Sequence, residues 1–176
     1  RVSASHNTVV VNGENHTSFD GGVTINYDNN HIHAESKNVY QDIDFGRSIT
    51  IHESGFTDVF SVKAQTEQVF DFFFHLEEKV QILTTLNMEP GSLGFIQHGY
   101  EHISNVQQIH NQHQFELRLG SFDITCEIET EGKTLFLADT LDNPVNRTRK
   151  TWIVRFKGTE TEFRFRWTIK RSESHE

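Results

Sequence analysis

The sequence is poor in cysteine, proline and methionine. Its 176 residues include one cysteine, Cys126, two prolines and one methionine, Met88. A single cysteine excludes an intramolecular disulfide framework and a cysteine-built zinc site, so any metal would have to be bound by His, Asp or Glu side chains. Cys126 alternates with Ile124 and Ile128, which indicates a core-facing strand position and argues against a thiol nucleophile.

The chain also lacks long apolar runs and an excess of positive charge. No stretch approaches the ~18–20 continuous apolar residues of a membrane helix, and no apolar signal core follows Arg1. With 16 Lys and Arg against 25 Asp and Glu, the formal net charge is −9, which argues against binding to nucleic acid or to an anionic membrane. Because the chain opens at Arg1 and its sole methionine is Met88, we expect a piece of a larger protein.

The composition is that of one folded domain. Hydrophobic residues make up 35% and aromatic residues 11% of the chain, which is too rich in core-forming side chains for a disordered segment. Domains cluster near ~100–150 residues, so we expect residues 1–176 to form a single domain.

Apolar residues recur with the period of two that is typical of strands. In residues 163–170, Phe, Phe, Trp and Ile alternate with Arg, Arg, Thr and Lys, which predicts one buried and one solvated, basic face. Residues 151–170 are predicted to form a terminal hairpin with its turn at 157–160. The alternation between residues 115 and 128 slips by one at Gly120-Ser121, which predicts a bulge or sharp bend there.

The segment 69–76 is too continuously apolar for a half-solvated strand and is predicted to be buried on both faces. Asn12-Gly13 after the Val9-Val10-Val11 strand is a strong turn signal. We expect further strands at 48–51, 59–62 and 134–137, and long loops at 107–114 and 139–146. Strands at this spacing, with few prolines and no helical period, predict an all-β fold, an antiparallel β-sandwich of the super-sandwich type.

Eleven histidines require a metal or proton-transfer role to be weighed. His31 and His33 stand two apart, so on a strand both rings share one face and could bind a metal, although an exposed strand face is the preferred interpretation. His75 ends the most apolar stretch and needs a hydrogen-bond partner if buried, which favours a satisfied core histidine over a ligand. His6 lies at a strand entry, where a side chain can face a cleft. Four histidines in polar, loop-like sequence are interpreted as solvated: His98, His102, His110 and His113.

Several catalytic motifs are missing from the sequence. There is no Gly-x-Ser-x-Gly elbow, no phosphate-binding Gly-Lys-Ser/Thr loop and no His-Glu-x-x-His pair. No spacing of the carboxylates singles out an acid/base pair. The sequence therefore contains no complete catalytic set.

Residues 6–13, His-Asn-Thr-Val-Val-Val-Asn-Gly, resemble the His-Asn-Thr-Val-Val-Val-Asp-Gly signature of the heparinase II/III-like polysaccharide lyases, which include heparinases and oligoalginate lyases. Asn12 departs from the family, which usually has Asp there. Later features follow in a similar order: Tyr40 and Arg47 leading a strand, Thr57-Asp58-Val59 at an aspartate that ends a buried strand, and Phe74-His75-Leu76 in a Phe-His-Leu-like element. The resemblance covers nearly the whole chain, although only residues 6–13 match strongly.

The resemblance implies an N-terminal α/α toroid followed by a C-terminal antiparallel β-sandwich, with uronic-acid polysaccharides cleaved by β-elimination. The toroid of such enzymes supplies the Tyr and His acid/base groups, so no catalytic residue is expected in this chain. By the same resemblance His6 is a metal ligand, usually to zinc, whose partner ligands lie upstream of Arg1. We therefore expect zinc or another divalent metal in the intact protein, no tightly bound metal in this chain, and a partly exposed His6 at the edge of the sandwich.

Asn7, Arg147 and Arg149 are the candidate substrate-binding residues. Arg147, Arg149 and Lys150 form the only short basic run in a loop-like segment, for which a solvated loop is the simpler interpretation. The expected partners are a uronic-acid polysaccharide and the toroid, without nucleic acid or membrane, in the periplasm or outside the cell. A non-catalytic carbohydrate-binding or adhesion sandwich, or a purely structural domain, remains the alternative, and the parent reading frame would separate them.

Overall fold

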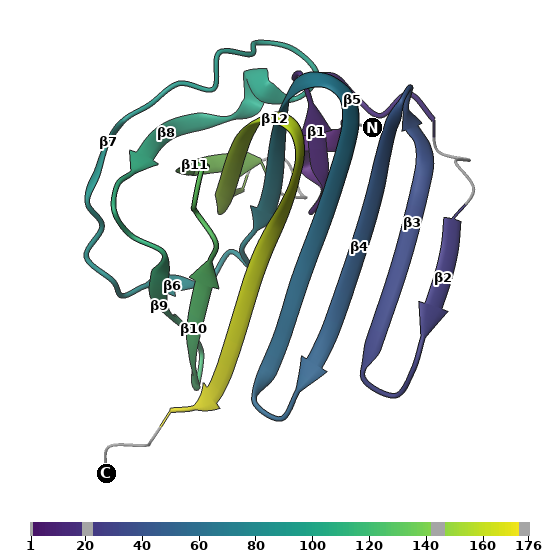
Figure 1. Ribbon diagram of the computed structural model, residues 1–176. Coiled ribbons are helices and arrows are strands. Elements are labelled where there is room, and N and C mark those ends of the chain that lie inside the picture. Colours follow the sequence, from purple (N-terminus) through teal and green to yellow (C-terminus); the bar gives the residue numbers. More distant parts are fainter. Residues whose placement is uncertain (1, 19–22, 142–146, 173–176) are drawn as a thin grey trace.

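The computed structural model describes residues 2–18, 23–141 and 147–172, which form twelve strands and two short 3₁₀ helices. All the strand pairs of these residues are antiparallel, and they stack as the two layers of a sandwich (Figure 1). The prediction of an all-β antiparallel sandwich is therefore confirmed. Both helices of the described residues, η1 (Ser3–Ser5) and η2 (Tyr100–His102), are far too short to cross a membrane.

The larger layer follows the hydrogen-bonded order β2-β3-β4-β5-β12-β10-β9-β6. Its strands are β2 (Val23–Tyr27), β3 (His31–Tyr40), β4 (Ile43–His52), β5 (Gly55–His75), β12 (Thr148–Arg171), β10 (Phe122–Ile128), β9 (Gln114–Leu119) and β6 (Gln81–Ile82). The second layer adds β1 (Val9–Val11), β11 (Thr134–Leu141), β8 (Ser104–Ile109) and β7 (Met88–Pro90). In that layer β1 pairs with β5, β11 joins β12 to β8, and β8 pairs with β7.

Strands β5 and β12 belong to both layers. They pair along almost their whole length, from Thr151 opposite His75 to Thr168 opposite Gly55, with a register shift between Gly158 and Glu160. This ribbon curves over from one layer into the other (Figure 1). The Phe156 ring lies where a Cβ on Gly158 would stand, so any larger residue at this corner would require that ring to move.

The prediction of a terminal hairpin at 151–170 is wrong. Both halves of the segment belong to the single strand β12, and each pairs with β5 instead of with the other half. The turn-forming sequence at 157–160 bends the strand between the layers but does not reverse it, because β5 offers a continuous antiparallel partner on both sides of the corner.

The core between the layers is aromatic. Its largest fully buried side chains are Trp152, Phe70, Phe72, Phe115, Phe163 and Phe165. Phe72 meets Phe165 edge to face at 5.2 Å, and Phe115 lies 4.5 Å from Trp152. Burying each such side chain stabilises the fold by about 1.5–3 kcal/mol at most. The inward face predicted for residues 163–170 is confirmed at Phe163, Phe165 and Trp167, whereas Ile169 at the end of the strand is 38% exposed.

The prediction that residues 69–76 are buried on both faces is confirmed. Phe70 and Phe72 point into the core between the layers. Phe73 points the other way, into a smaller cluster with Leu93 and Tyr100, which lie in the connection between β7 and β8. That connection therefore covers the outer face of the second layer.

Three local predictions need comment. Gly120 and Ser121 form a tight reversal between β9 and β10, with Leu119 opposite Phe122 and Gly120 at φ +58°, instead of a bulge within one strand. The long loop expected at 107–114 is wrong, since β8 reaches Ile109 and β9 begins at Gln114. Of the loop expected at 139–146, residues 139–141 belong to β11, and residues 142–146 lie outside the described residues.

Candidate functional site

The His6-Asn7 segment lies at the edge of the sandwich between η1 and β1 (Figure 1). The His6 N–H donates to the Ser3 carbonyl, and the His6 carbonyl accepts from Thr8 N–H at 2.9 Å. The Phe73 N–H on β5 donates to the Thr8 carbonyl at 3.0 Å. The backbone around His6 is therefore fixed. Its side chain is exposed, as predicted, and its ring makes no hydrogen bond or ion pair with the described residues.

Asn7 anchors this segment on two sides. Its Oδ1 accepts a hydrogen bond from the His75 N–H at 2.8 Å, and its carbonyl accepts one from Arg47 Nη1 at 2.7 Å. The first bond ties the segment to the end of β5 and the second to β4. Asn7 therefore has a structural role, and only its Nδ2 remains for a ligand.

Arg47 and Asp58 form an ion pair beneath this segment. Arg47 donates from Nε to Oδ1 at 2.9 Å and from Nη2 to Oδ2 at 2.6 Å, and Asp58 is buried. The guanidinium also lies over the rings of Phe60 and Phe72. Breaking such a pair leaves an uncompensated charge in the core. The pair therefore holds Arg47 in the position from which it binds the Asn7 carbonyl.

His75 is a satisfied core histidine, as predicted. Its Nε2 donates to the Ala4 carbonyl at 3.0 Å, which leaves Nδ1 as the acceptor for the hydroxyls of Thr151 at 2.8 Å and Thr140 at 3.2 Å. Because Ala4 lies two residues before His6, this ring is a further anchor for the N-terminal segment.

Tyr40 and Asn12 hold the other end of the signature. The Tyr40 hydroxyl donates to the Glu14 carbonyl at 2.6 Å and accepts from Val11 N–H, and burial raises its pKa. Asn12 has φ +51°, a left-handed conformation that asparagine tolerates well. Its Oδ1 accepts from Val69 N–H, and its Nδ2 donates to Gln68, a bond that an aspartate at this position could not donate.

The basic run at the start of β12 lies near this segment. Arg149 donates from Nη2 to the Ser5 carbonyl at 3.1 Å, which brings it beside the residue before His6. Arg147 is exposed and forms an ion pair with Glu78 at 3.1 Å. The structure thus brings His6, Asn7 and Arg149 together, with Arg147 paired to an acidic side chain.

Lys150 in the same run is engaged by a carboxylate. It pairs with Asp139 at 2.6 Å, and Asn105 donates to the same carboxylate at 2.7 Å. Burial alone would raise the pKa of Asp139, but these two hydrogen bonds lower it below its usual value. Lys150 therefore serves the pairing of β11 with β12.

His16 is a neighbour of His6 that sequence reasoning missed. Its ring is half-buried, meets Tyr40 edge to face at 5.3 Å, and donates from Nε2 to the Val9 carbonyl at 3.0 Å. Burial lowers the pKa of His16, and the nearby His6 ring lowers it further. The sequence around His16 carries no signal of this placement, because it is the turn at residues 12–15 that brings His16 beside the signature at residues 6–13.

The contacts around His6 determine which side chains are available to bind a metal ion. Within residues 2–18, 23–141 and 147–172, no three His, Cys, Asp or Glu side chains form a group that could hold a metal ion. His6 offers an open imidazole, whereas the Nε2 of His16 is occupied by the Val9 carbonyl. Within the described part of the chain, His6 therefore presents one open imidazole, and a metal held there would need further ligands from elsewhere.

His31 and His33 share one face of β3, as their spacing predicts. The Nδ1 atoms bond to the hydroxyls of Thr50 and Ser48 on β4 at 2.9 and 2.7 Å, and His33 also pairs with Glu35 at 2.9 Å. Three of the histidines interpreted as solvated also pair with glutamates at the surface: His98 with Glu14, His102 with Glu101 and His110 with Glu89.

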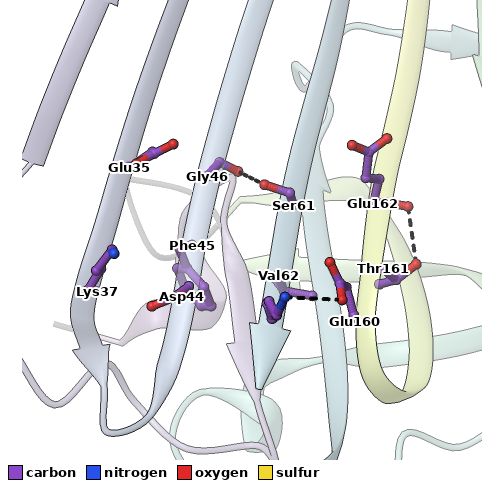
Figure 2. Close-up of a pocket in the computed structure, with 11 residues that line it drawn as sticks. Glu35, Lys37, Asp44, Phe45, Gly46, Ser61, Val62, Glu160, Thr161 and Glu162 are labelled. Atoms are coloured by element: carbon purple, nitrogen blue, oxygen red, sulfur yellow. Dashed lines mark hydrogen bonds and ion pairs between the residues drawn. The ribbon is translucent and has the colours of Figure 1, made fainter. Parts of the chain in front are cut away.

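A hollow of 560 Å³ lies on this same polar face (Figure 2). Gly46 and Ser61 form its floor, where the Ser61 hydroxyl donates to the Gly46 carbonyl at 3.3 Å. The charged side chains that line it are Glu35, Asp44, Glu160 and Glu162 with Lys37 and Lys63. Four carboxylates against two ammonium groups repel an acidic sugar, so the hollow does not suit a uronate.

Asp71, Arg155 and Tyr100 form a second buried polar cluster, which sequence reasoning missed. Asp71 accepts two hydrogen bonds from Arg155 at 2.7 Å and one from the Tyr100 hydroxyl at 2.7 Å. Burial and the Asp71 carboxylate raise the pKa of Tyr100. The available signal was the lone carboxylate inside the apolar run 69–76, because a buried charge must be paired. The cluster fixes the covering segment on the outer face of the second layer.

Comparisons with known proteins show likeness in fold only. A scan against protein-family models finds no match, and a search of curated sequences finds none either. Among solved structures, heparan sulfate lyase HepC from Pedobacter heparinus aligns over 99% of this chain with a TM-score of 0.65 and 11% identity. A heparinase III gene product gives 0.62 and 12% over 99%. A galactose mutarotase-like protein from Lactobacillus casei gives 0.54 and 8% over 87% of this chain and 74% of its own.

The two lyases confirm, at the level of the fold, the resemblance that the sequence shows to heparinase II/III-like enzymes. This chain spans 25% of the length of each lyase chain. The shared fold is therefore one part of those larger proteins.

Proposed function

We propose that this chain is the β-sandwich part of a heparinase II/III-like polysaccharide lyase, in which it walls the substrate cleft and donates His6 to a metal. The anchoring of the signature carries this proposal. Asn7, Arg47 and His75 hold the backbone around His6 while its imidazole stays exposed and unengaged. A free ring on a fixed backbone is what a metal ligand requires.

Zinc or another divalent metal is the proposed cofactor of the longer protein. When bound, the ion would supply a tie between His6 and ligands from elsewhere in that protein, and so would order this wall of the cleft. Among the described residues His6 is the single proposed ligand, so we expect no tight metal binding by the 176 residues alone.

The proposed substrate is a uronic-acid polysaccharide, met by Asn7, Arg147 and Arg149. Arg149 lies beside the His6 segment, and the exposed ion pair of Arg147 with Glu78 is weak enough for a bound anion to replace. The acid/base groups are proposed to come from an N-terminal α/α toroid, because a general base must reach the proton that it removes. The intact protein is proposed to act in the periplasm or outside the cell.

The test compares His6→Ala with the exposed-loop control His113→Ala in the natural full-length protein. We expect metal content and β-elimination, followed by the ultraviolet absorbance of unsaturated uronate products, to fall together by about tenfold or more in His6→Ala alone. The 176-residue chain should form no product. Full metal and full activity after His6→Ala, or stoichiometric zinc in the 176-residue chain, would contradict the ligand assignment. Polysaccharide binding by this chain, with no elimination by the full-length protein, would support a carbohydrate-binding sandwich instead.

A further inference from the structure

Strands β2, β3 and β4 form a wing of the larger layer, and one face of this wing is apolar and open. Its exposed side chains are Val23 at 59%, Ile25 at 57%, Tyr27 at 81%, Ile32 at 45% and Ile51 at 56%. They share one face, because Tyr27 pairs with Ile32, and Ile32 with Ile49 on β4, across antiparallel strands. In Figure 1 the wing stands to one side of the second-layer strands.

The open face continues the hydrophobic core. On β4 the same side of the strand carries Ile51, which is exposed, and Phe45, which is buried in the core. The opposite side of the wing carries polar residues such as Thr24, His33 and Glu35. Soluble monomers rarely leave a contiguous apolar patch of more than a few hundred Å² in water. The alternation of the wing is therefore typical of a sheet whose apolar face is covered by another layer.

Charge restricts what can cover the face. Along the described strands of the wing, the charged side chain on this side is Arg47, and its charge is already compensated by Asp58. An acidic polysaccharide would find no free cation here. A layer of apolar side chains packed at about 10 Å is the complementary surface.

Chain length indicates where such a layer comes from. This chain aligns with 25% of the length of the lyase chain and with 74% of the length of the mutarotase-like protein. Both proteins therefore contain further polypeptide beyond the shared fold. Arg47 at the rim of the open face also binds the Asn7 carbonyl, so the N-terminal segment lies beside the wing. Polypeptide joined to that segment would reach the face without a long connection.

We propose that the open face of the wing is an intramolecular docking surface, covered by a further apolar segment of the same, longer polypeptide. The inference rests on the proposed function in one respect, since both require a longer protein. It does not depend on the metal, the substrate or the activity.

Cysteine labelling tests this proposal. Ile25→Cys places a thiol on the open face, and Thr24→Cys places one on the opposite face of the same strand as a matched control. Cys126 is fully buried and burial raises its thiol pKa, so it contributes little background. Each variant is made in the 176-residue chain and in the natural full-length protein with its other accessible cysteines replaced. Ile51→Cys repeats the test if Ile25→Cys does not fold, as judged by circular dichroism.

In the 176-residue chain we expect both thiols to react with maleimide at rates within about threefold, since both are exposed. In the full-length protein the Ile25→Cys thiol should react at least about tenfold more slowly while the Thr24→Cys thiol is unchanged. Equal labelling of Ile25→Cys in the two proteins would overturn the proposal. Protection in the 176-residue chain that grows with its concentration would assign the face to a second copy, and a natural reading frame of these 176 residues alone would also overturn it. Protection without lyase activity would leave this inference standing and refute the proposed function.

Discussion

Along its strand order, the larger layer has a covered side at β12 and an open side at β2 to β4. Both sides carry the same sequence alternation, but they differ in burial. On β12, Phe163 and Phe165 are 1% and 0% exposed, whereas on β2 Ile25 and Tyr27 are 57% and 81% exposed. Second-layer strands, including β1 and β11, lie over the part of the larger layer that holds Phe163 and Phe165. They do not lie over the part that holds Ile25 and Tyr27. A period of two therefore identifies the apolar face of a strand, but it does not show whether the same chain covers that face.

The largest effect is expected at the buried charge of Asp71, beneath the connection that covers the outer face of the second layer. Asp71→Asn should lower the free energy of unfolding by about 3–5 kcal/mol, because Arg155 is left without its counter-charge in the core. Urea unfolding followed by tryptophan fluorescence measures this. Glu127→Gln, in an exposed pair with Arg166 at 4.0 Å, is the control and should change stability by less than about 1 kcal/mol. Equal effects of the two substitutions would contradict the assignment.

The same truncation on the two sides tests the comparison directly. Phe165→Ala removes a fully buried ring from the covered side and should cost about 3–5 kcal/mol. Tyr27→Ala removes an exposed ring from the open face and should change the stability of the 176-residue chain by no more than about 0.5 kcal/mol. A loss of several kcal/mol in Tyr27→Ala would show that this face is covered in the isolated chain.

An intermediate effect is expected at Arg47, on the boundary between the two sides. Arg47→Met leaves Asp58 unpaired and the Asn7 carbonyl without its donor, at a cost of about 2–3 kcal/mol. Amide hydrogen exchange should also speed up at Thr8. Lys63→Met, in an exposed pair with Glu160, should do neither. Unchanged exchange at Thr8 after Arg47→Met would remove Arg47 from the anchoring of the signature.

The smallest effect concerns pH. Folding lowers the pKa of His16, so the unfolded chain binds this proton more tightly, and stability is lost as the pH falls through the ordinary value of 6.5 towards the folded pKa. His16→Gln keeps a donor for the Val9 carbonyl without a titrating ring. We therefore expect its unfolding free energy to fall less steeply than that of the wild type between about pH 7.5 and 5.5. His113→Gln, in an exposed loop, should keep the wild-type slope.

Much of the fold could be predicted from local pattern alone. The strand alternation, the double burial of residues 69–76, the turn at Asn12-Gly13 and the satisfied His75 all follow from side chains within a few positions of one another. The corner at Gly158 could not be predicted, because the same residues allow a reversal or a bend. The partner strand β5 decides between the two.

The candidate site divides in the same way. His6 was found from an eight-residue motif, and its exposed position at the edge is confirmed, whereas its role as a ligand stays a prediction. The contacts that hold it join distant parts of the chain: Asn7 and Arg47 are 40 positions apart, and Ser5 and Arg149 are 144 apart. No local pattern encodes such pairs, since they depend on the path of the strands.

The ribbon of β5 and β12 has a consequence for how the chain folds. Its shortest-range strand pair joins His75 to Thr151, 76 positions apart, and every further pair along the ladder is more distant in sequence. The pairing of β5 with β12, which joins both layers, therefore requires the closure of one large loop. The entropy of that closure must be overcome before any of these contacts forms. Topologies of this kind fold in about milliseconds to seconds, far more slowly than helical bundles of similar stability. Until the ribbon closes, long unpaired strands stay open to other chains, which makes aggregation the main competitor of folding.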